Sequence, residues 1–453
     1  MKIVILGLGE VAKCTLSLIE QFIDVDSRHL YFVERNNLSA HPVVNGFLAR
    51  GAHFLQKNLT CENTLAVLGD EIAIGHRDLV IDLTTDTDMF HTVALCLENN
   101  WPYLNTCIEN SADAQLVHLR NHDKMASVIA SPAGRAYRAT CVFDHGMNPG
   151  LISSFVKKGL ADIAVLALQS GISPALKPAY EKRDYSAMAR ILGLETLHLS
   201  ELDDQTAALV PPGVFVNTWS CPGFLVEARA PVQIAWGTHE KEIPGGMLLT
   251  EGGMLMTEGE AWGALASSYV PHSEITGMLI PHEEIITLRR LLARPAYAPT
   301  IAYVYAVNPH TRRCFDEGLT NAEGGVVLTP AAHALTGTDR VGALFMLSRN
   351  PLTGQRGTWC YWCGTILRAE NPLFSPTVIQ VAAGVLAAAR WMIENPHAGI
   401  LFPEDLPHDE ILAFAAPHLG EIFSAPVPFT PGGRCFGDFL ISSAREIPEH
   451  LLR

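Results

Sequence analysis

The sequence is poor in positive charge. Its 453 residues include 32 Lys and Arg against 47 Asp and Glu, which gives a formal net charge of −15 at pH 7. Nucleic-acid binding needs a basic surface that meets the phosphates, so this balance argues against that class of protein. An acidic surface suits a cationic substrate, but it also serves solubility alone.

Long apolar runs are lacking as well. The most apolar stretch, 378–393, has about 16 residues and includes Gln380 and Arg390, whereas a membrane span needs about 20 apolar residues. We therefore predict a buried helix there. The apolar run after Met1-Lys2 is too short for a secretory signal and has no small-residue cleavage site. We expect a cytoplasmic protein without a membrane partner.

The ten cysteines form no recognisable disulfide or metal framework. A chain of this length without a signal segment is expected to keep its thiols reduced. Cys360 and Cys363 have CxxC spacing, but no second pair accompanies them, and the aromatic residues between them are typical of a buried strand. The sequence also has no HExxH and no GxSxG motif. We expect no metal site and no hydrolase of either type.

Residues 1–145 alternate short apolar runs with amphipathic stretches, the pattern of a parallel sheet with crossover helices. Apolar periodicity predicts helices at 11–22 and 87–99. The predicted strands are 2–6, 29–33, 79–83, 103–105 and 127–129. Continuous apolar character at 2–6 and 79–83 indicates strands that are covered on both faces.

A glycine-rich motif follows the first predicted strand. Gly7-Leu8-Gly9-Glu10-Val11-Ala12 matches G-x-G-x-x-A directly before a helix. Gly7 permits the tight turn, Gly9 lets the backbone approach a pyrophosphate, and the helix N-terminus supplies amides to the phosphates. We predict a Rossmann domain that binds a dinucleotide through Gly7, Leu8, Gly9, Glu10 and Val11.

An acidic residue ends the second predicted strand. The Glu34 carboxylate can accept hydrogen bonds from the adenosine ribose hydroxyls and would repel a 2′-phosphate, which favours NAD over NADP. Arg35 follows directly and could weaken this preference.

A polar segment ends the strand predicted at 79–83. Ligands collect at the carboxyl edge of such sheets, so Thr84, Thr85 and Asp86 are expected to line the nicotinamide ribose. Helix capping explains the neighbouring Thr87 and Asp88 equally well.

The character of the sequence changes at about Asn148. A helix is expected to about residue 160, and residues 195–370 then mix short strand-like runs with Gly/Pro turns, as in a largely antiparallel α+β domain. A strong helix at 377–394 ends at Asn395-Pro396 and could return to the nucleotide domain. We predict an NAD-binding domain at 1–145, an α+β substrate domain at 146–375 and a C-terminal helical segment at 376–453.

Several longer segments carry a further signal. They are Phe143-Asp144-His145-Gly146-Met147-Asn148-Pro149-Gly150-Leu151, Leu199-Ser200-Glu201-Leu202-Asp203, Asn217-Thr218-Trp219-Ser220, Glu227, Trp236-Gly237-Thr238-His239-Glu240, Ile280-Pro281-His282-Glu283 and Glu394-Asn395-Pro396-His397-Ala398-Gly399. Together they resemble the saccharopine-dehydrogenase-like superfamily and, within it, the bacterial homospermidine synthases. They span nearly the whole chain in the family's order, so the set is more specific than any single motif.

The resemblance implies a transferase that uses bound NAD as an internal redox cofactor. One putrescine would be oxidised to an imine, a second putrescine would attack, ammonia would leave, and the retained NADH would reduce the new imine to homospermidine. It also implies polyamine substrates and a homodimer formed through the second domain. Whether spermidine can replace putrescine as donor stays open.

A diammonium substrate needs carboxylates at its ends, an apolar wall along its stem and a base for an ammonium proton. The resemblance assigns Glu201 and Glu227 to the ammonium groups. It assigns Trp219 to the cationic imine, because an indole face stabilises a cation. Without the resemblance, surface glutamates and a core tryptophan would explain these residues, and Trp236 is a second candidate indole.

Three further residues complete the predicted catalytic set. Asn148, with Pro149 beside the nicotinamide, resembles an amide that contacts the substrate, although an Asn-Pro-Gly turn would use it anyway. Glu109 follows a Rossmann strand and is assigned to the distal ammonium. His282 is a candidate for proton handling or an ordinary loop residue. Which carboxylate acts as base stays open.

Two other interpretations remain. A saccharopine- or carboxynorspermidine-type dehydrogenase would act on an amino-acid amine and would need an arginine clamp, for which Arg229 and Arg340 are candidates. A non-catalytic NAD-binding protein is the second, and it gains weight if Trp219, Glu201 and Glu227 do not converge near the nicotinamide.

Overall fold

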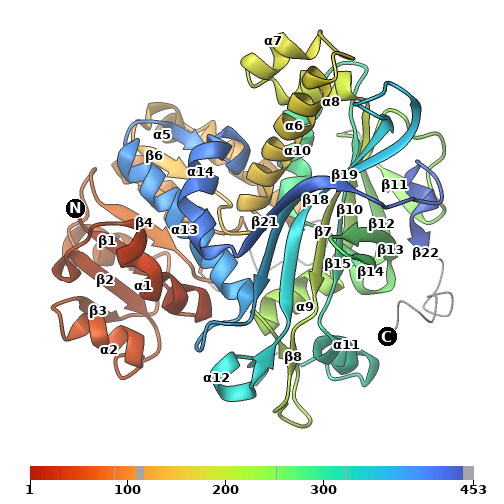
Figure 1. The fold of residues 1–453 in the computed structure, drawn as a ribbon. Coiled ribbons are helices and arrows are strands. Elements are labelled where there is room, and N and C mark those ends of the chain that lie inside the picture. Colours follow the sequence, from red (N-terminus) through yellow and green to blue (C-terminus); the bar gives the residue numbers. More distant parts are fainter. Residues whose placement is uncertain (86, 109–116, 251, 322–323, 442–453) are drawn as a thin grey trace. The chain divides into compact units, whose positions relative to one another are not determined.

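The computed structural model describes residues 1–85, 87–108, 117–250, 252–321 and 324–441 (Figure 1). Two compact units account for the chain. The first combines Met1–Leu151 with Thr377–His418, and the second combines Ile152–Pro376 with the chain from Leu419 onward. The predicted fold class, a parallel Rossmann-type sheet with a second α+β part, is confirmed.

A seven-stranded sheet in which every pairing is parallel forms the centre of the first unit. Its order is β20-β6-β5-β4-β1-β2-β3. The strands are β1 (Ile3–Leu6), β2 (Leu30–Glu34), β3 (His53–Gln56), β4 (Leu79–Asp82), β5 (Tyr103–Asn105), β6 (Thr140–Val142) and β20 (Gly399–Leu401). The strand order reverses at β1, because β2 lies on one side of it and β4 on the other. Open parallel sheets bind ligands beyond the carboxyl ends of the strands at such a point.

The helices of the first unit include two that the sequence predicts to within two residues, α1 (Glu10–Phe22) and α3 (Met89–Asn99). The others are α2 (Pro42–Leu48), α4 (Val117–Ile129), α5 (Pro132–Ala136), α13 (Pro376–Glu394) and α14 (His408–Ala415). The α3 helix begins after Asp88, whose carboxylate accepts from the His91 amide at 3.2 Å and caps the helix.

The strand predicted at 127–129 is wrong, because these residues end α4 and the next strand is β6. The buried positions of α4 include His118, Asn121, His122 and Met125, which follow the 3.6-residue helical period. Three of these four side chains are polar, so a search for apolar periodicity misses the helix and finds only the short apolar run at its end.

The long apolar helix α13 belongs to the first unit from Thr377 onward. It is the one helix among the described residues that is long and apolar enough to cross a membrane, and 83% of its most apolar window is buried inside the protein. A Cβ atom on Gly384 would lie 2.0 Å from the carbonyl oxygen of Gly146, so the helix packs directly on the backbone there. Figure 1 shows α13 and α14, in blue, among the red and orange elements of this unit.

An eleven-stranded sheet dominates the second unit. Its main path is β11-β12-β10-β15-β7-β18-β19-β21, and β14, β13 and β22 extend from β15. The strands are β7 (Leu194–Asp203), β10 (Pro231–Ala235), β11 (Met247–Leu249), β12 (Met254–Glu260), β13 (Leu265–Val270), β14 (Ser273–Ile280), β15 (Thr300–Ala306), β18 (Thr338–Arg349), β19 (Arg356–Arg368), β21 (Glu421–Val427) and β22 (Leu440–Ile441). The β15–β7 pairing is parallel and the other pairings of this sheet are antiparallel, as the sequence predicts for most of it.

The described part of the second unit also contains seven α-helices and two small ribbons. The helices are α6 (Leu151–Gln169), α7 (Leu176–Glu181), α8 (Tyr185–Leu192), α9 (Cys221–Arg229), α10 (Glu283–Leu292), α11 (Pro309–Asp316) and α12 (Pro330–His333). The ribbons pair β9 (Val216–Asn217) with β16 (Val326–Val327) and β8 (Thr206–Ala207) with β17 (Leu335–Thr336). Within the strand-like part of the sequence, residues 213–219 form a strand only at Val216–Asn217. Cys360 and Cys363 lie on β19, where burial raises the pKa of each thiol to about 12.

The description of 376–453 as a helical segment needs correction. Besides α13 and α14, this part of the chain contains β20, which pairs with β6, and β21, which pairs with β19. These short strands are completed by partners far away in the sequence, so local periodicity does not reveal them. The domain boundaries at 145 and 375 stay a prediction.

Candidate active site

The glycine-rich turn after β1 has the geometry that its motif requires. Gly7 has a φ of +80°, in the left-handed region, and a Cβ atom there would lie 2.9 Å from the carbonyl oxygen of Leu83. Gly9 precedes α1, and a Cβ atom there would meet nothing within 4 Å. The turn is therefore closed on the side of β4 and open at Gly9, where a bound phosphate would approach the helix amides.

Glu34 is held against this turn by backbone amides. Its Oε2 accepts from the Leu8 amide at 2.9 Å and its Oε1 accepts from the Asn36 amide at 2.8 Å. Each carboxylate oxygen has a second acceptor position, so the group can still accept from two ribose hydroxyls. Arg35 is exposed beside it. The residues of the first unit thus fit a dinucleotide.

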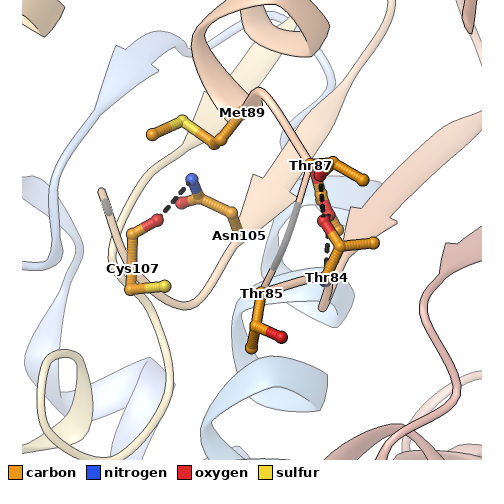
Figure 2. A pocket seen from close by; sticks show the side chains of 7 residues that line it. Thr84, Thr85, Thr87, Met89, Asn105 and Cys107 are labelled. Atoms are coloured by element: carbon orange, nitrogen blue, oxygen red, sulfur yellow. Dashed lines mark hydrogen bonds between the residues drawn. The ribbon is translucent and has the colours of Figure 1, made fainter. Parts of the chain in front are cut away.

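A small pocket lies at the carboxyl ends of β4 and β5 (Figure 2). Its lining residues are Asp82, Thr84, Thr85, Thr87, Met89, Asn105 and Cys107. The Asp82 carboxylate accepts from the Thr84 hydroxyl at 2.6 Å and from the Tyr103 hydroxyl at 2.8 Å, and burial raises the pKa of Asp82. Thr84 and Thr85 thus line a pocket at the predicted edge of the sheet. Asp86 lies outside the described residues.

Asn105 connects this pocket to the turn of Asn148. Its side-chain oxygen accepts from the Asp144 amide at 3.0 Å, and its carbonyl oxygen accepts from the His145 amide at 2.9 Å. The turn itself closes through the Gly146 amide, which donates to the Pro149 carbonyl at 2.8 Å. Sequence reasoning missed Asn105, because an asparagine at a strand end is also an ordinary turn residue.

The second unit brings the predicted carboxylates and histidine together. Glu201 lies on β7, Glu227 on α9 and His282 directly before α10, and all three are buried. His282 Nε2 lies 3.6 Å from Glu227 Oε1, and His282 Nδ1 lies 2.5 Å from Glu284 Oε2. Glu109, assigned to the same substrate, lies outside the described residues.

The charge state of Glu201 follows from its surroundings. Burial raises the pKa of this carboxyl to about 8, and the nearby charges of Asp203 and Glu227 act in the same direction. The hydrogen bond that Tyr303 donates to it opposes the shift, as does the charge of His282. Glu201 can therefore exchange a proton close to neutral pH.

His282 is shifted upward by its carboxylate neighbours. Burial alone would lower the pKa of this imidazole, but Glu284 and Glu227 outweigh it and raise the pKa well above its usual range. The ligand atoms of His282, Glu283 and Glu284 lie within 4.8 Å of one another, close enough to hold a cation. Because buried carboxylates outnumber the one imidazolium in this cluster, it favours a positively charged ligand.

Trp219 lies in the loop before α9 and is half-buried. Its indole Nε1 donates to the Tyr305 hydroxyl at 3.2 Å, and its ring meets Phe224 edge to face at 6.1 Å. The preceding Thr218 donates its hydroxyl to the buried Asp203 at 2.6 Å. Trp236, the alternative indole, packs against Phe436 instead.

Sequence reasoning gave no role to Asp203 and missed Tyr303 and Tyr305. Alternating aromatic residues on a strand are typical of a core, so no local signal separates these tyrosines from packing residues. The two candidate arginines for a carboxylate clamp are engaged elsewhere. Arg340 donates to Asp204 at 2.9 Å, and Arg229, which is exposed, donates to the Thr320 carbonyl at 2.9 Å.

Comparisons with known protein families cover both units. Residues 3–131 match the saccharopine dehydrogenase NADP binding domain, and residues 146–422 match the saccharopine dehydrogenase C-terminal domain. The homospermidine synthase of Blastochloris viridis is 28% identical over 466 residues, which cover 95% of this chain and 92% of the relative. That of Mesorhizobium japonicum is 28% identical over 468 residues and covers 96% and 92%.

Solved structures share the fold. The homospermidine synthase from Legionella pneumophila in complex with NAD has 24% identity and a TM-score of 0.81, with 97% of each chain covered. The apo saccharopine dehydrogenase (L-Glu forming) from Saccharomyces cerevisiae has 12% identity and a TM-score of 0.55, with 94% of this chain and 99% of that chain covered. These comparisons confirm three predictions: the family resemblance, that the protein is an enzyme, and that its cofactor is a nicotinamide dinucleotide.

Proposed function

The chain belongs to the saccharopine dehydrogenase family, and on this premise we propose that it is a homospermidine synthase acting on putrescine. In the proposed reaction a first putrescine loses a hydride and a proton to become an imine. A second putrescine adds through its amine, and ammonia leaves. The resulting imine then gains a hydride and a proton, so that two putrescines yield one homospermidine and one ammonia. NAD, when bound, supplies the hydride acceptor and returns the same hydride.

The observation that carries this proposal is the buried acidic cluster of the second unit. Glu201, Glu227 and Glu284 surround His282, and the half-buried indole of Trp219 is linked to the same sheet through Tyr305. Carboxylates neutralise ammonium groups, and an indole face stabilises an iminium that exists only during turnover. A substrate with a carboxylate would meet repulsion in this cluster.

Proton transfer is the second task of the cluster. An alkyl ammonium has to lose a proton before hydride can leave its carbon. Glu201, with a pKa raised by burial to about 8, is suited to accept that proton, and the imidazolium of His282 is suited to return one to departing ammonia. We therefore propose Glu201 as base and His282 as acid.

The cofactor of the proposed reaction is NAD. Glu34 is fixed by the Leu8 and Asn36 amides at a position that would oppose a 2′-phosphate. The matched family is described as NADP-binding, whereas the Legionella relative was solved with NAD. Arg35, the residue that could favour NADP, is exposed.

The proposal is tested by incubating the purified protein with putrescine and a catalytic amount of NAD, and by quantifying homospermidine, ammonia and NADH. We expect equal amounts of homospermidine and ammonia with little NADH. Accumulation of NADH without homospermidine would favour a simple amine dehydrogenase, and no turnover would favour a non-catalytic NAD-binding protein. A cytoplasmic homodimer, and spermidine as an alternative donor, stay predictions.

A further inference from the structure

The central strand β15 carries two buried tyrosines, Tyr303 and Tyr305, separated by one residue. Residues two apart in a strand point to the same face of the sheet. β15 runs parallel to β7 with Tyr305 opposite Glu201 and Tyr303 opposite Leu199. Both hydroxyls therefore lie on the side of the sheet that carries Glu201, and each needs a hydrogen-bond partner there because it is buried.

Tyr303 binds the Glu201 carboxylate. Its hydroxyl donates to Glu201 Oε2, and its ring packs on the imidazole of His282 with 4.9 Å between centroids. One side chain thus contacts both groups that we assign to proton transfer. A phenylalanine would fill the same space, so packing alone does not account for the hydroxyl.

Tyr305 serves the indole. Its hydroxyl accepts from Trp219 Nε1 at 3.2 Å. Phe224 packs edge to face on both rings, at 6.1 Å from Trp219 and 6.2 Å from Tyr305. Two aromatic side chains, Phe224 from a helix and Tyr305 from a strand, therefore fix the plane of the indole.

We propose that Tyr303 and Tyr305 are positioning residues, the first for the Glu201 carboxylate and the second for the Trp219 indole. The inference rests on the proposed function, because it gives a role to the groups through which that reaction would occur. Hydride and proton transfer require groups held to within a fraction of an ångström, and buried hydrogen bonds from a rigid strand supply such precision.

The groups that act on Glu201 come from several elements. They are Asp203 on the same strand, Glu227 on α9, His282 before α10 and Tyr303 on β15. Only Tyr303 and His282 among them favour the ionised carboxylate and so lower its pKa. Removing the Tyr303 hydroxyl should therefore raise the pKa of Glu201 further above its ordinary value of 4.5.

The test compares Tyr303→Phe and Tyr305→Phe with Tyr361→Phe as a matched control. Tyr361 is a buried tyrosine on β19 of the same sheet, and its hydroxyl lies 2.9 Å from that of Ser424 on β21. Homospermidine formation is measured against pH. For Tyr303→Phe we expect kcat/KM to fall about 10- to 100-fold, as for loss of a hydrogen bond to a charged group, and its acid limb to move to higher pH. For Tyr305→Phe we expect kcat to fall roughly three- to tenfold without a shift of the limb.

A stability measurement without substrate separates this inference from the proposed function. A carboxyl whose pKa is higher in the folded than in the unfolded protein makes the fold less stable as the pH rises from the unfolded pKa to the folded pKa. Above the folded pKa this loss of stability stops. The Tm difference between wild type and Tyr303→Phe should therefore be larger at pH 9.5 than at pH 7, and that of Tyr361→Phe should not change. If wild type makes no homospermidine but this dependence is seen, the proposed function fails while the positioning of Glu201 stands. If wild type is active and both variants match Tyr361→Phe in rate, pH profile and stability, the positioning role is wrong.

Discussion

The dinucleotide turn of the first unit and the acidic cluster of the second differ in how far apart their residues lie in the sequence. Gly7, Leu8 and Gly9 are consecutive, and Glu34 joins them from the neighbouring strand. Glu201 and His282, by contrast, come from segments about eighty positions apart that meet at Tyr303. A local motif can specify the first arrangement, whereas only a completed sheet produces the second.

The two sites also differ in their electrostatics. The turn offers backbone amides and one half-exposed carboxylate, Glu34. The cluster offers buried groups whose protonation depends on their neighbours, with the pKa of both Glu201 and His282 raised. We therefore expect pH to act on the chemistry of the second unit much more than on dinucleotide binding in the first.

The largest expected effect is a loss of NAD affinity when the turn at Gly7 is distorted. Gly7→Ala puts a Cβ atom at 2.9 Å from the Leu83 carbonyl in a left-handed backbone conformation. Strain of this kind costs about 1–3 kcal/mol, so NAD affinity measured by calorimetry should fall roughly 10- to 100-fold. Gly46→Ala on α2, where a Cβ atom would meet nothing within 4 Å, is the control. Unchanged NAD affinity in Gly7→Ala would contradict the assignment of this turn.

A second substitution should separate turnover from cofactor binding. Trp219→Ala removes an indole expected to stabilise an iminium, an interaction worth up to about 2 kcal/mol, so kcat should fall about 30-fold. NAD affinity should stay within about twofold, since the residue belongs to the second unit. The control Trp236→Ala should leave kcat much closer to wild type. Parallel losses of kcat and NAD affinity in Trp219→Ala would indicate a structural tryptophan.

The pH dependence of kcat/KM tests the electrostatic difference between the dinucleotide turn and the acidic cluster. If Glu201 acts as base, kcat/KM for putrescine should rise about tenfold per pH unit below its pKa of about 8 and level off above it. NAD affinity should change far less over the same range. Glu201→Gln should be slow at every pH and lack this limb. If kcat/KM of Glu201→Gln still rises with pH in the same range, a group other than Glu201 is responsible for the pH dependence.

The smallest effect concerns cofactor choice. Glu34→Gln keeps the shape of the side chain but removes the charge that opposes a 2′-phosphate, so the preference for NAD over NADP should fall about fivefold. Arg35→Gln changes the exposed neighbour of Glu34 and should alter the preference for NAD over NADP by less. The ratio of dissociation constants for NAD and NADP measures both. A larger effect at Arg35 than at Glu34 would reverse the assignment.

How far the sequence predicts this protein depends on the residue. The turn at Gly7 and Gly9 and the strands β1, β4 and β5 follow from local pattern to within one residue. The α4 helix was missed because its buried face carries His118, Asn121 and His122. Glu201, Glu227, His282 and Trp219 were selected through a family resemblance, and their roles stay predictions. Local sequence pattern does not predict a role for Tyr303, Tyr305 or Asn105, because nothing local distinguishes them from core or turn residues.

The sequence by itself determined the dinucleotide turn, because its motif residues lie within one strand, one helix N-terminus and the next strand. It also determined the overall alternation of strands and helices through apolar periodicity. Only the tertiary structure decided which buried carboxylates meet, which hydroxyls orient them and how burial raises the pKa of Glu201. Desolvation and hydrogen bonding between distant segments exist only once the sheet has assembled, so no local pattern encodes them.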